Sequence, residues 1–232
     1  MDSLPSKSFN TTRWSIVMAA RVPGEEAERA MDELCQRYWP ALQRFAVRMG
    51  CSQQDADDMA QGFFLKIIEK DLFNRADPLR GKFRTFLITA FRRHMQDVWS
   101  GANAAKRGGD AEVVSYEAAP DEGGEIPDDA LFDREWAQRV MELSLERLRD
   151  RYAREKQQAA FDVLRPHMTG GLPEGGVAEL AEGLGVSQGA AKVALHRIRK
   201  RFAEELRLEV AETLSEDDAL EEELRYLMSA IA

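Results

Sequence analysis

The chain has 232 residues, 44% of them apolar, which suffices for one large or two small domains with hydrophobic cores. Its net charge is −9, whereas a simple DNA-binding domain is usually basic. Whether the chain can bind nucleic acid therefore depends on where its charges lie along the sequence, and not on their sum. Two cysteines and three scattered histidines suggest no disulfide framework, metal site or cofactor site. No apolar run reaches the roughly 18 residues that span a bilayer. Together these features predict a cytoplasmic protein without membrane contact.

Helical periodicity marks a first module, expected over residues 1–109. Apolar residues recur on one face from Met31 to Met49, and Gly50 suits the end of that helix. Ser52 should cap the next helix, with Asp55 in the acidic position of a capping box. The inward face of this second helix is expected to consist of Ala56, Met59, Ala60, Phe63, Phe64, Ile67 and Ile68.

A third helix is predicted after a loop that contains Pro78 and Gly81. Phe83 and Phe86 fall on its buried side, whereas Trp99, near the helix end, is expected to be exposed. From Arg80 to Arg107 seven basic residues and one acidic residue give a local charge of +6. This helix therefore carries one of two basic regions in an acidic chain.

An acidic stretch with several glycines and prolines follows, and residues 110–130 are expected to form a flexible linker. From Asp110 to Glu135 there are ten acidic residues and one basic residue, Arg134. Two interpretations stay open for this segment. It is either a solubilising tether or a polyanion whose carboxylates imitate nucleic acid at a basic surface.

A second helical module is predicted over residues 131–214, interrupted by a Gly- and Pro-containing run at 169–176. Near its end, Gly185 suits a left-handed helix terminus and Ser187 an N-cap. The following helix has a buried stripe and an opposite polar, basic face, an arrangement typical of a helix-turn-helix that binds DNA. The stripe consists of Ala191, Leu195, Ile198 and Phe202. No segment alternates apolar and polar residues, so the expected fold is all-α, with two helical domains joined by the acidic linker.

Residues 215–232 are predicted to form an acidic amphipathic tail, and eight acidic residues lie between Glu209 and Glu223. One interpretation is that the tail masks the basic helix. Its leucines would pack there and its acids would oppose Arg199, Lys200 and Arg201. The other interpretation is that Leu220, Leu224 and Leu227 complete the core of the second module.

Three sequence motifs occur together in the first module: Asp55-Ala-Asp-Asp-Met-Ala-Gln61, then Gly81-Lys-Phe-Arg-Thr-Phe-Leu87, then Arg92-Arg93 with Lys106-Arg107. They resemble domain 2 of bacterial RNA polymerase sigma factors of the extracytoplasmic-function group. The segment Ser187–Arg197 resembles the recognition helix of the C-terminal domain of these factors. The resemblance implies a non-catalytic subunit that binds the β and β′ subunits of core polymerase and directs promoter recognition, DNA melting and initiation.

The resemblance also implies three sets of site residues. The candidates for contact with the arginine-rich β′ surface are Asp55, Asp57, Asp58 and Gln61, although a purely capping role for Asp55 stays equally open. The candidates for the −10 element are Arg84, Arg92, Arg93, Trp99, Lys106 and Arg107. The candidates for the −35 element are Ser187, Gln188, Lys192, His196, Arg197, Lys200 and Arg201.

A stand-alone helix-turn-helix regulator that binds DNA without polymerase is the alternative function. An enzyme is not expected, because the glycines at 170–176 lack the Gly-Lys-Ser/Thr of a phosphate loop and the histidines have no evident nucleophile partner. Ala194 stands where relatives often have arginine, so the −35 sequence is left open. The regulator is left open too, with an anti-sigma factor or a Ser/Thr kinase among the partners considered.

Overall fold

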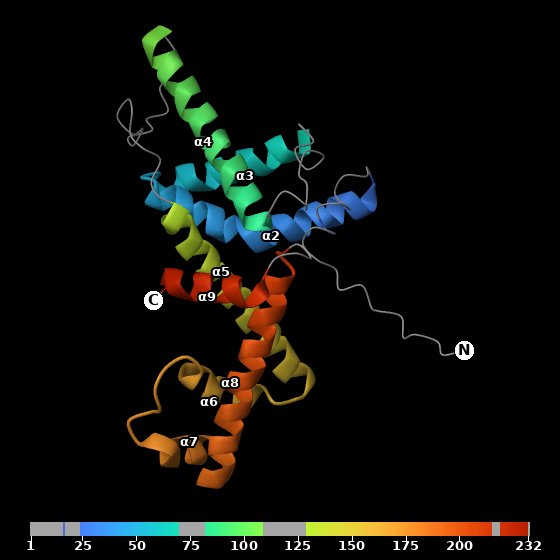
Figure 1. The fold of residues 1–232 in the computed structure, drawn as a ribbon, viewed down its shortest axis with the longest axis vertical. Helices are drawn as coiled ribbons and strands as arrows, with labels where there is room; N and C mark the ends of the chain where they lie inside the picture. Colours follow the sequence, from blue (N-terminus) through green and yellow to red (C-terminus); the bar gives the residue numbers. More distant parts are fainter. Residues whose placement is uncertain (1–15, 17–23, 70–81, 109–128, 215–218, 232) are drawn as a thin grey trace, which may run out of the picture. The chain divides into compact units, whose positions relative to one another are not determined.

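The computed structural model describes residues 16, 24–69, 82–108, 129–214 and 219–231 (Figure 1). The regular elements are α2 (Glu25–Arg48), α3 (Gln53–Glu69), α4 (Phe83–Gly108), α5 (Asp129–Arg154), α6 (Gln158–Leu164), the 3-10 turn η3 (Arg165–His167), α7 (Gly176–Leu184), α8 (Gln188–Ala211) and α9 (Leu220–Ile231). The all-α prediction is confirmed, since these described ranges contain no strand. None of the described helices is both long and apolar enough to cross a membrane.

The chain forms two compact units. The first unit runs to Arg139 and also contains the residues from Ala211 onward, and the second unit covers Val140–Val210. The sequence placed the start of the second module at residue 131, whereas the structural boundary lies inside α5. The expected linker at 110–130 falls almost wholly outside the described residues.

The first unit has an aromatic core built on α2, α3 and α4, with α2 and α3 side by side (Figure 1). Phe45, Phe63 and Phe91 are fully buried, and Phe63 and Phe91 meet edge to face with ring centroids 5.1 Å apart. Aromatic pairs of this geometry add to the stability gained from apolar burial. The predicted inward faces of these helices are thus largely confirmed.

Two positions in this core differ from the sequence expectation. Ile68 is 56% exposed, because α3 has turned its apolar face away by that residue. Trp99 is only 8% exposed, so the expectation of an exposed tryptophan is wrong. The reason lies in the helical period: Trp99 follows Phe91 at two steps of four residues and therefore shares its buried face.

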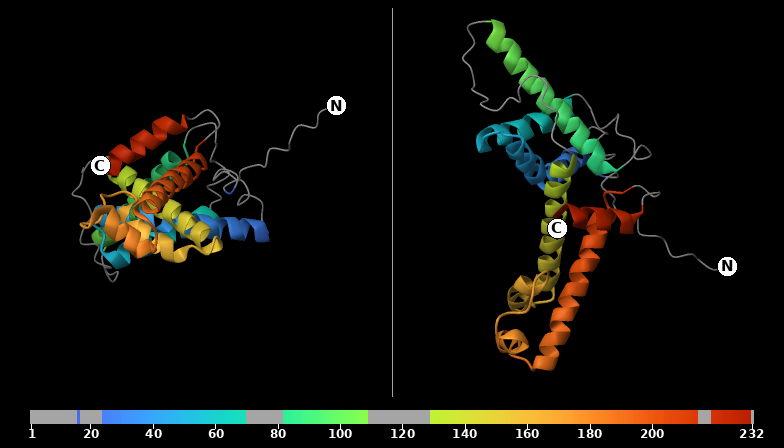
Figure 2. Two further views of the ribbon diagram at one scale, coloured as in Figure 1. Left: turned by 90° about the horizontal axis from the view of Figure 1, so that it is seen from below. Right: turned by 60° about the vertical axis from the view of Figure 1, so that its left-hand side comes forward.

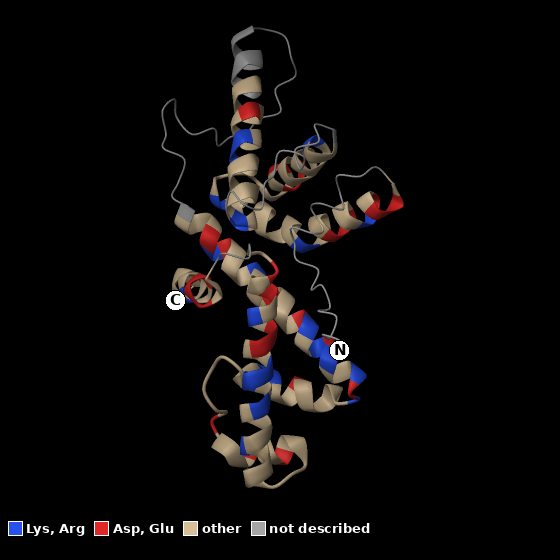
Figure 3. Cartoon of the chain, turned by 45° about the vertical axis from the view of Figure 1, so that its right-hand side comes forward, with Lys and Arg blue, Asp and Glu red and all other residues tan. Residues whose placement is uncertain are grey.

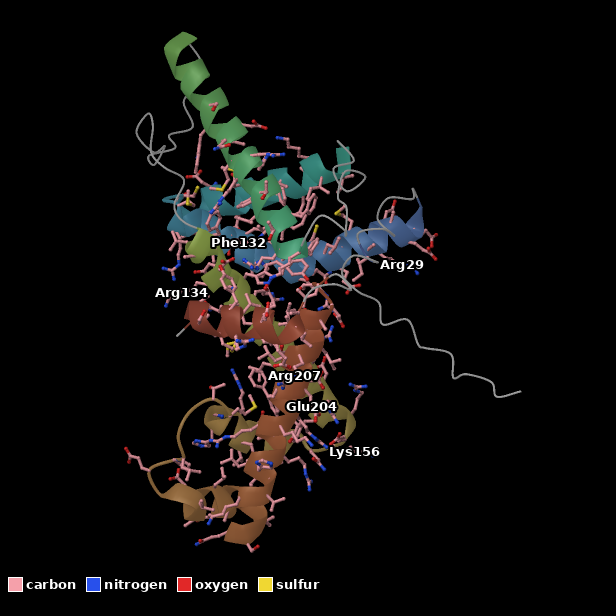
Figure 4. The ribbon with its side chains drawn as sticks, viewed as in Figure 1. Arg29, Phe132, Arg134, Lys156, Glu204 and Arg207 are labelled. Atoms are coloured by element: carbon pink, nitrogen blue, oxygen red, sulfur yellow. The ribbon has the colours of Figure 1, made fainter. Side chains whose placement is uncertain are left out.

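The start of α5 belongs to the first unit. Phe132 and Trp136 are fully buried, and Figure 4 shows Phe132 on the first turn of α5. The Trp136 ring stacks on Tyr38 at 4.8 Å with an interplanar angle of 4°. These large aromatic side chains need a deep apolar site, and the α2–α4 core supplies it.

Two acidic residues beside these aromatics are buried as counter-ions. Asp133 is 1% exposed and accepts a hydrogen bond from Arg84. Glu135 is also 1% exposed and accepts hydrogen bonds from Arg44 Nε at 2.9 Å and from Arg48 Nε at 2.5 Å. The sequence placed these two residues in the acidic stretch that ends at Glu135. In the structure each of them instead neutralises arginine inside the first unit.

The tail helix α9 also packs in the first unit, beside the starts of α4 and α5 (Figure 2). Glu223 is 2% exposed and accepts hydrogen bonds from Lys82 Nζ at 2.5 Å and Arg84 Nε at 3.2 Å. Tyr226 donates to Asp133, and Leu227 is fully buried. Leu224, Leu227 and Glu223 of the tail are therefore buried within the first unit, a placement that neither interpretation of the tail predicted.

The second unit has its own core, formed by α5, α6, α7 and α8 around Leu148, Phe161, Leu180 and Ile198. The Gly- and Pro-containing run at 169–176 closes a loop on this core. Arg199 secures the loop, donating to the carbonyl of His167 at 2.9 Å and to that of Gly170 at 3.1 Å. This run, without evident purpose in the sequence, is therefore an anchored part of the unit.

Replacing Glu223 by glutamine should lower the free energy of unfolding by about 3 kcal/mol, because Lys82 and Arg84 lose a buried counter-charge. The matched control is Glu222→Gln, since Glu222 is the exposed neighbour on the same helix. Urea unfolding of the full chain measures both. Equal stability of the two variants would show that the Glu223 pairs contribute nothing.

Acid should destabilise the first unit through His94, which is 8% exposed between Phe63 and Phe91. Burial, with a further contribution from the nearby Lys66, lowers the pKa of His94 below its usual 6.5, and Asp97 opposes this shift only in part. The unfolded chain then binds more protons than the folded chain between the lowered pKa and 6.5. This contribution to stability is present above pH 6.5 and is lost as pH falls through that window.

The variant His94→Leu should remove this part of the pH dependence of the melting temperature. His196→Ala, a change at an exposed histidine, should retain it. Parallel pH profiles for His94→Leu and the unchanged chain would contradict the assignment.

Candidate functional surfaces

The N-terminal turn of α3 is capped as the sequence predicts. Ser52 Oγ accepts the backbone N–H of Asp55 at 3.2 Å and donates to the Asp55 carboxylate at 2.7 Å. The Asp57 carboxylate accepts hydrogen bonds from Gln43 Nε2 at 2.6 Å and from Trp39 Nε1 at 3.4 Å. Both acids therefore have structural partners: Asp55 pairs with Ser52 at the N-cap of α3, and Asp57 with residues of α2.

An exposed stripe runs along the opposite part of α3. It consists of Asp58, Gln61, Leu65 and Ile68, whose spacing of three, four and three residues keeps them on one helix face. Leu65 is 52% exposed and Ile68 56%. Within the described part of the chain, neither Asp58 nor Gln61 makes a hydrogen bond or ion pair. This α3 stripe combines a carboxylate that has no described partner with apolar surface; the sequence motif pointed only to its polar residues, Asp58 and Gln61.

The basic residues of α4 fall into two groups: those that contact other side chains of the first unit and those that are exposed to solvent. Arg84 is enclosed by Asp133 and Glu223, with its guanidinium 5.0 Å from the centre of the Tyr226 ring. Arg92 lies over the Phe45 ring at 5.8 Å, and Arg93 is exposed. The expectation that Arg84 is available to DNA is therefore wrong. Lys106 and Arg107 lie in the last turns of α4, and their side chains are outside the described part.

The turn between α7 and α8 has the predicted chemistry. Gly185 is left-handed at φ 64°, and the N–H of Val186 reaches back to the carbonyl of Ala181 at 3.0 Å. Ser187 Oγ accepts the N–H of Ala190 at 3.2 Å, so the predicted N-cap is confirmed. The predicted stripe of Ala191, Leu195, Ile198 and Phe202 is buried.

The N-terminal part of α8 carries several basic residues, which are blue on the ribbon in Figure 3, and its outer face is polar and basic. Its exposed members are Gln188, Lys192, His196, Arg197 and Lys200. No hydrogen bond or ion pair ties these five side chains to other described residues. Arg201 differs, because it donates to Glu155 at 2.8 Å and lies 5.1 Å from the centre of the Tyr152 ring. This hydrogen bond lowers the pKa of Glu155 and marks Arg201 as a structural residue.

The described residues contain no cluster of His, Cys, Asp or Glu that could hold a metal ion. What the two units offer instead is exposed helix surface: the α3 stripe and Arg93 in the first unit, and the outer face of α8 in the second. Such surfaces suit binding to macromolecules.

In a comparison with protein families, residues 34–104 match the family described as Sigma-70 region 2. The match extends from α2 through α3 into α4, and so includes the α3 stripe and Arg93. No curated protein and no solved structure matches the chain.

Proposed function

We propose that this chain, which belongs to the sigma-70 family through its region 2, uses the α3 stripe to dock on core RNA polymerase and two basic surfaces to hold promoter DNA. Region 2 supports a sigma factor's role in binding core polymerase and recognising promoters. The assignment of each step to particular residues is our proposal.

The observation that carries the proposal is the position of the α3 stripe inside region 2. Asp58 is exposed and without a partner among the described residues, and Leu65 and Ile68 extend its face with apolar surface. A carboxylate beside apolar side chains fits an arginine-bearing helix, because charge-assisted hydrogen bonds gain strength where the neighbouring surface excludes water. Asp57 then acts by fixing α3 against α2, and Asp55 by capping α3.

For the −10 element, we assign the phosphate contacts to Arg93, with Arg92, Lys106 and Arg107 as further candidates. Capture of an unpaired strand needs cations for the backbone and flat or apolar surfaces for bases. Arg93 supplies an exposed cation on the region 2 helix α4. Arg84 and Trp99 are left out of this set, because Arg84 is paired with Asp133 and Glu223 and Trp99 is buried.

For the −35 element, we assign duplex contacts to the outer face of α8, through Gln188, Lys192, His196, Arg197 and Lys200. Their freedom from described partners and the tight α7–α8 turn suit a helix that enters the major groove. The same face would also serve a stand-alone DNA-binding regulator. Region 2 favours the sigma factor, because a stand-alone regulator needs no polymerase-docking surface.

The double variant Asp58→Ala with Gln61→Ala should weaken binding to core polymerase at least tenfold while leaving the melting temperature unchanged. The loss reflects one charge-assisted contact of about 1.5–3 kcal/mol. Titration of labelled chain with core polymerase gives the affinity, and Glu182→Ala in the second unit is the exposed-carboxylate control. Full affinity of the double variant would reject docking through the α3 stripe.

The variant Arg93→Ala should reduce open-complex formation severalfold without changing core binding or stability, because Arg93 is exposed and has no described partner. Permanganate footprinting of unpaired thymines on a transcribed promoter measures this. Arg84→Ala is the contrasting variant and should lower stability, because Asp133 and Glu223 both lose their arginine partner. Normal melting by the Arg93 variant would remove that residue from the −10 surface.

A further inference from the structure

An apolar side chain stands in the middle of the basic outer face of α8. Val193 is 56% exposed, and its sequence neighbour Lys192 is exposed as well. At 100° per residue, Val193 lies about 170° from the centre of the buried stripe of α8. It therefore points almost directly away from the core of the second unit, among the candidate DNA contacts.

The surroundings of Val193 leave it open to a flat or grooved partner. Gly189, one turn earlier on the same face, has no side chain, and a Cβ there would meet only Ser187 Oγ at 4.0 Å. Arg197 follows one turn later and is exposed. A partner can approach the α8 backbone closely at Gly189 and contact Val193 directly.

Folding gives no reason for valine at this position. A β-branched residue is a poorer helix former than alanine, and an exposed valine gains little from burial. The charge around it indicates the kind of partner. From Gln188 to Phe202 the helix carries five basic residues and no acidic one, so the face suits a polyanion and not the apolar surface of another protein.

We propose that Val193 reads the C5-methyl group of thymine in the duplex element bound by α8. In the major groove thymine alone among the four bases presents a methyl group, and apolar side chains contact it. This inference rests on the proposed function, in which α8 enters that groove. Val193 thereby determines specificity, and its cationic neighbours hold the phosphates and the more polar base edges.

The experiment starts from holoenzyme assembled from the full chain and core polymerase. Selection from a library of random duplexes defines the upstream element that the holoenzyme prefers. Each thymidine of that element is then replaced singly by deoxyuridine, which removes the methyl group and nothing else. Affinity is measured for the unchanged chain, for Val193→Ala, and for Leu208→Ala, a matched variant at another exposed apolar residue of α8.

At one or two positions, deoxyuridine should weaken binding of the unchanged chain about fourfold, equivalent to the roughly 0.8 kcal/mol of one buried methyl group. Val193→Ala should bind thymidine and deoxyuridine duplexes equally there, whereas Leu208→Ala should retain the fourfold difference. The melting temperature of Val193→Ala should not fall, because the side chain is exposed.

Two results would overturn the inference, and they differ from failure of the proposed function. Either no thymine position responds to loss of its methyl group, or Val193→Ala responds as strongly as the unchanged chain. If the selection enriches no upstream element at all, it is the assignment of α8 to promoter DNA that fails, and the inference fails with it.

Discussion

Buried pairing between acidic residues of α5 and α9 and basic residues of α2 and α4 is the constraint on which the first unit depends. Asp133, Glu135 and Glu223 are each at most 2% exposed, and each meets at least one arginine. A buried carboxylate without its partner would be strongly destabilising. These pairs therefore bind the start of α5 and the tail helix α9 to α2 and α4, although the paired residues lie far apart in sequence.

The same pairing decides which cations remain for function. Lys82 and Arg84 neutralise Glu223, and Arg201 holds Glu155, so they serve the fold. Arg93 and the outer face of α8 keep exposed side chains without partners among the described residues. A count of basic residues along the sequence therefore overestimates the nucleic-acid surface. Leu65, Ile68 and Val193 are exposed apolar side chains, and we expect a macromolecular partner to contact each of them.

Local signals predicted the local structure well. The Ser52 and Ser187 caps, the left-handed Gly185 and the buried stripe of α8 all follow from contacts within a few residues. Long-range pairing was not predictable from one sequence. An acidic residue has the same local pattern whether it faces water or a cation about 140 positions away, as Glu223 faces Lys82 and Arg84. Trp99 was wrongly predicted to be exposed, although its spacing of two four-residue steps from Phe91 was available as a signal. Leu65 was missed because only its polar neighbours matched a motif.

The most direct test of the account compares the affinity of the full chain for core RNA polymerase with its affinity for free promoter duplex, followed by transcription from the assembled holoenzyme. The account predicts tight binding to core polymerase, weak and sequence-independent binding to free duplex, and promoter-specific initiation only when both components are present. Sequence-specific binding of the free chain to duplex DNA, with no measurable affinity for core polymerase, would contradict it.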